Sequence, residues 1–134
     1  MQNAEIPHQL IKADIGLYPA VNDIHMNLAT PTKVLEFSAM GIPIVSSRLK
    51  MVEKIFGNSA IMFFEAQNVS QFMKCVVELY QNPELRAKLT ANAYRIFVQK
   101  FSWDREFHIY LDVLHRLLLG TTEICYLNTE KDSG

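Results

Sequence analysis

The sequence has few cysteines and no glycine-rich loop. Cys75 and Cys125 form neither a CxxC pair nor another metal-ligand spacing, so they predict two buried, reduced thiols. The five glycines form neither a GxGxxG nor a GxxxxGK motif, which excludes the two common glycine-rich phosphate loops. Ser38, Ser46 and Ser47 lack the pattern of a nucleophile elbow and its triad partners, so a hydrolase is not favoured.

Neither sign of charge is in excess, and long apolar runs are absent. Thirteen Lys and Arg residues against fourteen Asp and Glu residues give a net charge of −1, so no surface for nucleic acid is indicated. Apolar runs such as VLHRLLLG are short and broken by charge, so no membrane span is expected. The N-terminal MQNAEIPHQ lacks the pattern of a secretion signal, and we therefore expect a cytoplasmic protein.

The chain does have enough apolar residues for a folded core. Its 134 residues are 49% hydrophobic and 20% charged, which is typical of one globular domain. The patterns predict a short helix over 6–13, strands over 14–20, 43–47 and 59–65, helices over 31–41 and 51–57, and longer helices over 68–82, 83–100 and 102–120. Residues 20–30 are polar and are predicted to be a functional loop. We assign 1–120 to a partial domain and 121–134 to a polar tail.

Strands that alternate with helices indicate an α/β fold with a parallel sheet and helices on both faces. Only about three strands are predicted, followed by C-terminal helices. We interpret this as a three-layer half-Rossmann arrangement, the second half of a doubly wound domain. The strand over 14–19 would then have an open edge, which proteins seldom leave bare. We therefore expect the isolated chain to form a homodimer that buries this edge or the helix from Ser102.

The helix predicted from Pro31 has an unusual first turn. Thr30 fits its N-cap, Pro31 its first position and Gly41 the residue past its end. Lys33 lies in the first turn, where the helix dipole disfavours a cation by about 0.3–1 kcal/mol. The sign reverses if a phosphate binds at this end of the helix, because helix N-termini bind anions.

Glu36 follows Lys33 by three residues, so the two side chains share one face of the helix. A carboxylate can accept two hydrogen bonds, which suits the vicinal diol of a ribose. The pattern therefore fits a nucleotide, with phosphates near Thr32 and Lys33 and the ribose at Glu36. The alternative is an ordinary solvated Lys–Glu pair, which would stabilise the helix by roughly 0.5 kcal/mol at most.

Three segments together resemble one family. PTKVLEFSAMGIPIVSS (31–47) resembles the donor-site signature of the group 1 glycosyltransferases, which have the two-Rossmann-domain GT-B fold. ADIGLYPA (13–20) resembles the strand that leads into that site, and FSWDREFHIYLDVLHRLL (101–118) is similar to the family's closing helix. The resemblance implies that this chain is the C-terminal part of the donor-binding domain.

The resemblance also implies roles for the residues of the signature. Glu36 would bind the ribose hydroxyls of a nucleotide-diphosphate sugar. Thr30, Thr32 and Lys33 would lie against its diphosphate, with no metal and no cofactor in the site. Catalytic residues stay unassigned.

One position departs from the family pattern. Many relatives have a second glutamate eight positions before Glu36, facing the sugar, and here that position is Leu28. His25, Asn27 and Asn22, which lie in the preceding loop, are the candidates for a sugar contact.

The resemblance implies transfer of a sugar from a nucleotide donor to an acceptor. Complete enzymes of this family have an N-terminal Rossmann domain, and without that partner the chain is expected to be inactive. Two alternatives stay open. The chain could be a non-catalytic interaction domain with a vestigial site, or part of a sugar-nucleotide epimerase with the same fold.

Overall fold

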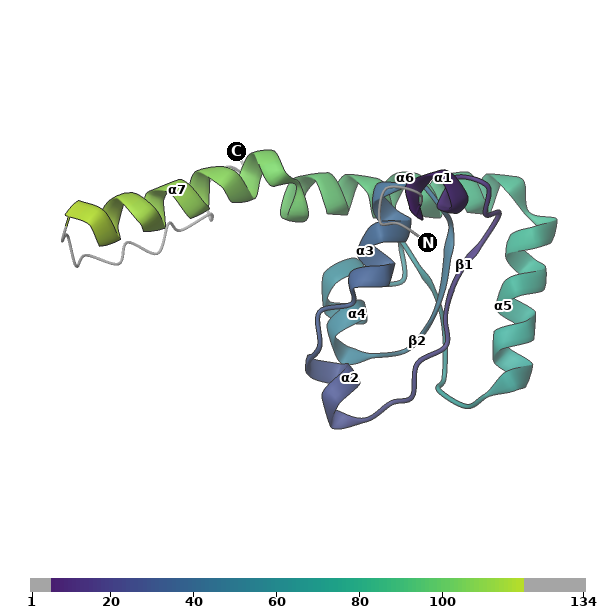
Figure 1. The fold of residues 1–134 in the computed structure, drawn as a ribbon. Helices are drawn as coiled ribbons and strands as arrows, with labels where there is room; N and C mark the ends of the chain where they lie inside the picture. Colours follow the sequence, from purple (N-terminus) through teal and green to yellow (C-terminus); the bar gives the residue numbers. More distant parts are fainter. Residues whose placement is uncertain (1–5, 120–134) are drawn as a thin grey trace, which may run out of the picture. The chain divides into compact units, whose positions relative to one another are not determined.

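The structure is a computed structural model that describes residues 6–119, with ten helices and strands (Figure 1). In chain order they are α1 (Ile6–Leu10), β1 (Gly16–Tyr18), α2 (Ile24–Leu28), α3 (Thr32–Ala39), β2 (Ile44–Ser47), α4 (Lys50–Phe56), β3 (Met62–Phe64), α5 (Val69–Gln81), α6 (Pro83–Phe101) and α7 (Trp103–Leu119). The α/β class is confirmed. One compact unit ends at Phe101 and a second begins at Ser102.

The three strands form one parallel sheet, as predicted, and their order in it is β1-β2-β3. Gly16 pairs with Ile44 and Val45 pairs with Met62. Each strand is shorter than its predicted range. Within the described residues β1 has a strand neighbour on one side only, so the expected open edge is present.

The middle strand joins two hydrophobic clusters, one on each face of the sheet. Successive residues of a strand point to opposite faces. Ile44 packs with Val34 of α3, and Val45 packs with Leu79 of α5. All four residues of β2 are buried, as expected for a strand covered on both faces. Helices on both faces confirm the predicted three layers.

The C-terminal end of α3 forms the turn that the sequence indicates. Gly41 has a φ of +68°. Its N–H donates to the carbonyl of Ser38 at 3.3 Å, and the N–H of Ile42 donates to that of Phe37 at 3.0 Å. These two bonds form a Schellman motif, which satisfies carbonyls that the last turn leaves free.

The N-terminal end of α3 differs from the prediction. Pro31 is the N-cap, not the first helical residue, and Thr30 lies one position further out. The reason is the backbone of Pro31, whose φ of −80° and ψ of 70° are those of an inverse γ-turn. Within this turn the N–H of Thr32 donates to the carbonyl of Thr30 at 2.9 Å. The helix therefore begins at Thr32.

The predicted loop over 20–30 contains a short helix, α2. Asp23 is its N-cap, and its carboxylate accepts from the N–H of Met26 at 2.7 Å. This local bond stabilises a helical turn in a segment whose polar composition indicates a loop. The prediction of a wholly irregular segment is therefore wrong.

The longer helices follow the prediction more closely. Pro83 begins α6, and the side chains of Asn68 and Asn82 accept from the N–H groups of Gln71 and Leu85 at the starts of α5 and α6. Among residues 6–119 no helix is both long and apolar enough to cross a bilayer.

The helix α7 belongs to the second unit. It begins just after Ser102, whose carbonyl accepts from the N–H of Glu106 at 3.1 Å. The rings of Trp103 and Phe107 lie 5.8 Å apart on this helix. The proposed tail over 121–134 and Cys125 lie outside the described residues.

Candidate functional site

The candidate site lies at the carboxyl edge of the parallel sheet, where α/β domains commonly bind ligands. The chain passes from β1 through α2 to the beginning of α3 at this edge (Figure 1). The crossover then returns through α3 to β2. The sheet therefore directs the N-terminal end of α3 toward the side of the domain where its strands end.

One face of α3 is buried and the other is free for a ligand. Val34 and Ser38 face the core, and the Ser38 hydroxyl donates to the carbonyl of Val34 at 2.8 Å. Thr32, Lys33 and Glu36 are exposed. This is the arrangement that the three-residue spacing of Lys33 and Glu36 predicts.

The side chains of Lys33 and Glu36 have no polar partner among residues 6–119, and they do not form an ion pair with each other. The structure therefore does not contain the solvated Lys33–Glu36 ion pair that the alternative interpretation expects. Both the ammonium and the carboxylate stay available to a ligand.

The backbone at the start of α3 keeps two donors. The γ-turn uses the N–H of Thr32, and the N–H of Leu35 donates to the carbonyl of Pro31 at 3.1 Å. Between them, the N–H groups of Lys33 and Val34 have no acceptor among the described residues. Val34 is fully buried, whereas Lys33 is exposed, so only the N–H of Lys33 can meet an anion, and the nearby ammonium adds to that attraction.

Asn27, a candidate for the sugar contact, has a structural role. Its Nδ2 donates to Oδ1 of Asn22 at 2.5 Å and to the carbonyl of Asp23 at 2.7 Å. Its Oδ1 accepts from the N–H of Lys50, the first residue of α4, at 2.8 Å. The amide thus fixes α2 to the start of α4, and both of its donor hydrogens are already used.

The remaining predicted residues lie at the surface beside α3. His25 and Leu28 are exposed on α2, and Thr30 is exposed just before the γ-turn. The side chain of Leu28 is 72% exposed at the position where many relatives have a glutamate. No described carboxylate takes the place of that glutamate on α2, since Asp23 caps the helix.

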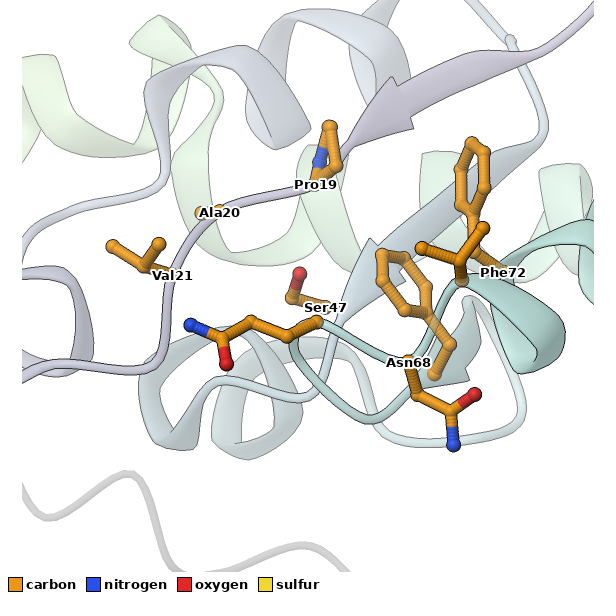
Figure 2. A pocket seen from close by; sticks show the side chains of 9 residues that line it. Pro19, Ala20, Val21, Ser47, Asn68 and Phe72 are labelled. Atoms are coloured by element: carbon orange, nitrogen blue, oxygen red, sulfur yellow. The ribbon is translucent and has the colours of Figure 1, made fainter.

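A second feature of the carboxyl edge was not predicted from the sequence. A cavity of about 190 Å³ lies past the ends of all three strands and is lined by residues 19–21, Ser47, Phe64, residues 67–69 and Phe72 (Figure 2). Thr32, Lys33 and Glu36 do not line it. The only sequence signal is a pair of serines at the end of the otherwise apolar strand PIVSS.

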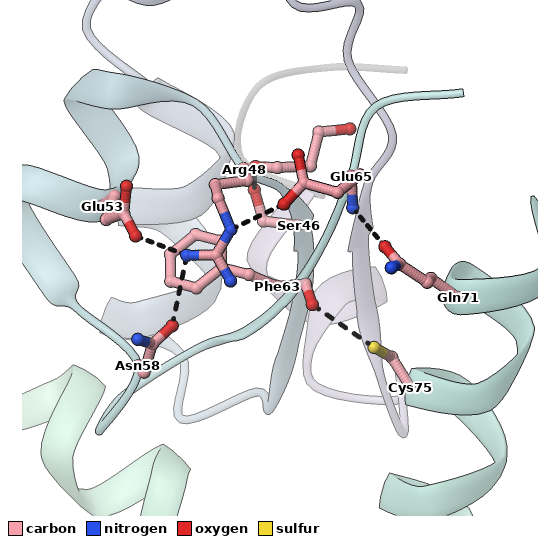
Figure 3. Close-up of polar contacts among 9 residues, drawn as sticks. Ser46, Arg48, Glu53, Asn58, Phe63, Glu65, Gln71 and Cys75 are labelled. Carbon is pink, nitrogen blue, oxygen red and sulfur yellow. Dashed lines mark hydrogen bonds and ion pairs between the residues drawn. The ribbon is translucent and has the colours of Figure 1, made fainter. Parts of the chain in front are cut away.

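Arg48, the residue after β2, is not free to bind an anion. Its guanidinium pairs with Glu53 and with Glu65, whose Oε1 lies 3.0 Å from Nε (Figure 3). It also lies over the ring of Phe63, 5.1 Å from the centroid. The two carboxylates neutralise the arginine, so this cluster connects β2, α4 and the end of β3.

Cys75 is buried, as predicted, and is 8% exposed. Its thiol lies 3.6 Å from the carbonyl of Phe63 (Figure 3). Burial raises the pKa of this thiol, and the negative charge of Glu78 raises it further. The thiol is therefore a packing group and a poor nucleophile. In the described part of the chain no three His, Cys, Asp or Glu side chains are grouped to hold a metal ion.

The parallel sheet, its flanking helices and the exposed start of α3 define an α/β domain of the half-Rossmann type. The sequence model of the glycosyl transferase-like family matches residues 1–112, and the chain belongs to this family. The match covers α1 to α6 and part of α7. It confirms the resemblance to the group 1 glycosyltransferases and agrees with half of a GT-B domain. No curated protein matches the sequence.

Proposed function

We propose that this chain forms the donor half-site of a glycosyltransferase that uses a nucleotide-diphosphate sugar. The observation that carries the proposal is the exposed start of α3, where the side chains of Lys33 and Glu36 have no polar partner among residues 6–119. Family membership supplies the class of reaction.

The diphosphate would bind at the N-terminal end of α3. The N–H of Lys33 has no acceptor among the described residues, and the Lys33 ammonium lies in the same turn. Together they would stabilise the negative charge that develops on the departing nucleoside diphosphate. The proposed site uses neither a metal ion nor a cofactor.

The ribose would bind one turn further along the helix, at Glu36. A carboxylate with no competing donor can accept a hydrogen bond from each of two adjacent hydroxyls. Such charge-assisted bonds are shorter and stronger than bonds between neutral groups. Glu36 would therefore select for a nucleotide over a free diphosphate.

Sugar transfer also needs residues that bind the acceptor, and Lys33 and Glu36 are assigned here to the donor. We propose that catalysis requires an additional Rossmann-type domain and that the chain alone binds the donor without turnover.

Calorimetry with the purified chain tests donor binding. The titrants are uridine, guanosine and adenosine diphosphates and their sugar conjugates. Saturable binding of one nucleotide, weakened by added salt, is the expected result, because the phosphate contacts are exposed to solvent. Absence of binding across the whole panel would contradict the proposal.

A non-catalytic interaction domain is the second candidate, and two observations favour it. Ile24 and Leu28 on α2 are 83% and 72% exposed, and β1 has an unpaired edge within the described residues. Exposed apolar side chains and open strand edges promote association. In this case we propose that two copies of the chain associate as a homodimer through β1.

A further inference from the structure

The cavity at the ends of the three strands contains an unsatisfied polar group. Ser47 is 1% exposed, and its hydroxyl has no hydrogen-bond partner among the described residues. Such a group costs free energy unless a ligand or water completes its bonding. The neighbouring Ser46 is equally buried, but its hydroxyl donates to the carbonyl of Ser47 at 2.9 Å. Ser47 is therefore the serine whose hydroxyl is left for an occupant.

Ser47 is one of the residues that line the cavity. It ends β2, and in Figure 2 its side chain lies between the chain at Pro19 and Ala20 and the segment that includes Asn68. The cavity thus collects residues that follow β1, end β2 and follow β3. This is the edge of a parallel sheet at which ligands bind.

The lining excludes charged ligands and selects a compact ring. No Lys, Arg, His, Asp or Glu lines the cavity, so a phosphate or a carboxylate would be buried there without a counter-charge. Its volume of about 190 Å³ exceeds the roughly 150 Å³ of a protein cavity that holds benzene. A six-membered ring with small substituents is the size that fits.

The polar groups of the cavity suit a sugar ring better than a nucleobase. The buried end offers the single hydroxyl of Ser47, and the amides of Gln67 and Asn68 also line the cavity. Asn68 uses its Oδ1 to cap α5, while its Nδ2 has no acceptor among the described residues. A nucleobase would bury several polar atoms of one edge against one hydroxyl, whereas a pyranose can keep most of its hydroxyls at the mouth.

The apolar wall supplies the rest of the contact. Phe64 and Phe72 pack edge to face with centroids 5.1 Å apart, and both line the cavity. Val21 and Val69 are 53% and 70% exposed, so they form the open mouth. The C–H faces of a pyranose can pack against such a surface, with burial of apolar area as the driving force.

We propose that this cavity binds a neutral pyranose ring, with Ser47 as the hydrogen-bonding group at its buried end. The proposal rests on the proposed function only for the choice of a sugar as ligand. The pyranose could belong to the donor or to the acceptor, and the site is separate from the diphosphate site at Lys33.

Amide NMR spectra of the full chain during titration with methyl glucoside, methyl mannoside and methyl galactoside test the proposal. Saturable changes at Ser47, Asn68 and Phe72 at millimolar concentration are expected for at least one of them. No change with any of the three would overturn the proposal. Uridine is the comparison ligand, and a response of the same amides to uridine alone would also overturn it.

Three variants test the role of the serine. Ser47→Ala is expected to weaken pyranoside binding by about three- to tenfold, the range for loss of one neutral hydrogen bond. Ser46→Ala is the matched control and should bind as the wild type does. Val21→Trp changes an exposed residue at the mouth and should abolish binding. Equal binding by wild type and Ser47→Ala would contradict the assignment of the hydroxyl.

The same spectra keep the two proposals distinguishable. Binding of nucleoside diphosphates is detected as changes in the amide signals of Lys33 and Val34, and binding of pyranosides as changes in the amide signal of Ser47. Pyranoside binding without nucleotide binding would support the cavity and contradict the donor site, and the reverse result would overturn only the cavity. If a nucleotide sugar displaces the methyl pyranoside, the bound ring is the donor sugar. If a nucleotide sugar binds at Lys33 and leaves the methyl pyranoside in place, the cavity is not the site of the donor sugar.

Discussion

Gly16 of β1 lies directly against the ring of Phe37 on α3. A Cβ added at Gly16 would lie 2.6 Å from Cδ2 and 2.8 Å from Cγ of that ring. The absence of a side chain lets α3 pack closely on β1. A glycine inside a strand often marks such a close approach, either of a ligand or of another part of the chain. Here the approaching group is an aromatic side chain.

Gly16→Ala should therefore destabilise the domain through overpacking. We expect the free energy of unfolding to fall by about 1–3 kcal/mol, because the ring of Phe37 must move away from the sheet. Chemical denaturation followed by circular dichroism measures this loss. In the double variant Gly16→Ala/Phe37→Leu the two losses should be less than additive, since the smaller side chain relieves the clash. Strict additivity would argue against direct contact as the cause.

Asn27→Ala should destabilise the connection between α2 and α4. The variant leaves the N–H of Lys50 at the start of α4 without its acceptor and removes the bonds to Asn22 and Asp23. Loss of a capping acceptor costs about 0.5–2 kcal/mol, and we expect a fall in that range in the free energy of unfolding. Asn22→Ala removes one of the three bonds and should cost less. If Asn27→Ala binds nucleotide as the wild type does once folded, its role is structural.

The features that the sequence predicts well depend on short stretches of chain. The turn at Gly41 and the start of α6 at Pro83 follow from the conformational limits of those residues. The parallel sheet follows from the alternation of strands with helices along the chain. The sequence predicts the start of α3 one residue too early, because a proline fits both the N-cap and the first helical position. Only its ψ, which the sequence does not specify, distinguishes the two.

The cavity at Ser47 depends on packing among distant segments. Residues that follow β1, end β2 and follow β3 come together only when the sheet forms. The outward direction of Lys33 and Glu36, by contrast, depends on helical spacing within one segment, and the structure agrees with it. Binding at that face of α3 stays a prediction.

The thiol of Cys75 should make the stability of the domain depend on pH. Burial and the charge of Glu78 raise its pKa in the folded state above the ordinary value of 9.0. Below that value the thiol is protonated in both the folded and the unfolded state, so its contribution to the free energy of unfolding is fully present. As the pH rises above 9.0 the unfolded state loses the proton first, so the free energy of unfolding falls until the folded thiol also ionises.

Denaturation as a function of pH in a Cys125→Ser background measures this slope. Adding Cys75→Ala to that background should flatten the fall above pH 9.0 and lower the stability at neutral pH by about 1 kcal/mol or more, because a buried group is truncated. Maleimide should label Cys75 slowly in the folded state. Rapid labelling would show that the thiol is accessible and would contradict its buried position.

The edge of β1 should mediate self-association of the isolated chain. Leu17, the middle residue of this strand, is 43% exposed. Leu17→Lys places a charge on the edge strand, which natural proteins use to prevent strand pairing. We expect sedimentation velocity to show a dimer for the wild type and a monomer for this variant. Tyr80→Lys changes a 77% exposed residue on α5 and should leave the dimer intact. A monomeric wild type would contradict the proposed homodimer.

Lys33 and Glu36 should contribute to nucleotide binding in different ways. Lys33→Ala removes a charge from the proposed phosphate site and should weaken binding of both a nucleoside diphosphate and inorganic pyrophosphate by about tenfold, or roughly 1.4 kcal/mol. Glu36→Gln should weaken only the nucleoside diphosphate, because pyrophosphate has no ribose for the carboxylate to bind. Calorimetry with both ligands measures the difference. Lys54→Ala on α4 is the charge-matched control and should bind both ligands normally. If Glu36→Gln weakens the two ligands equally, the carboxylate does not bind the ribose.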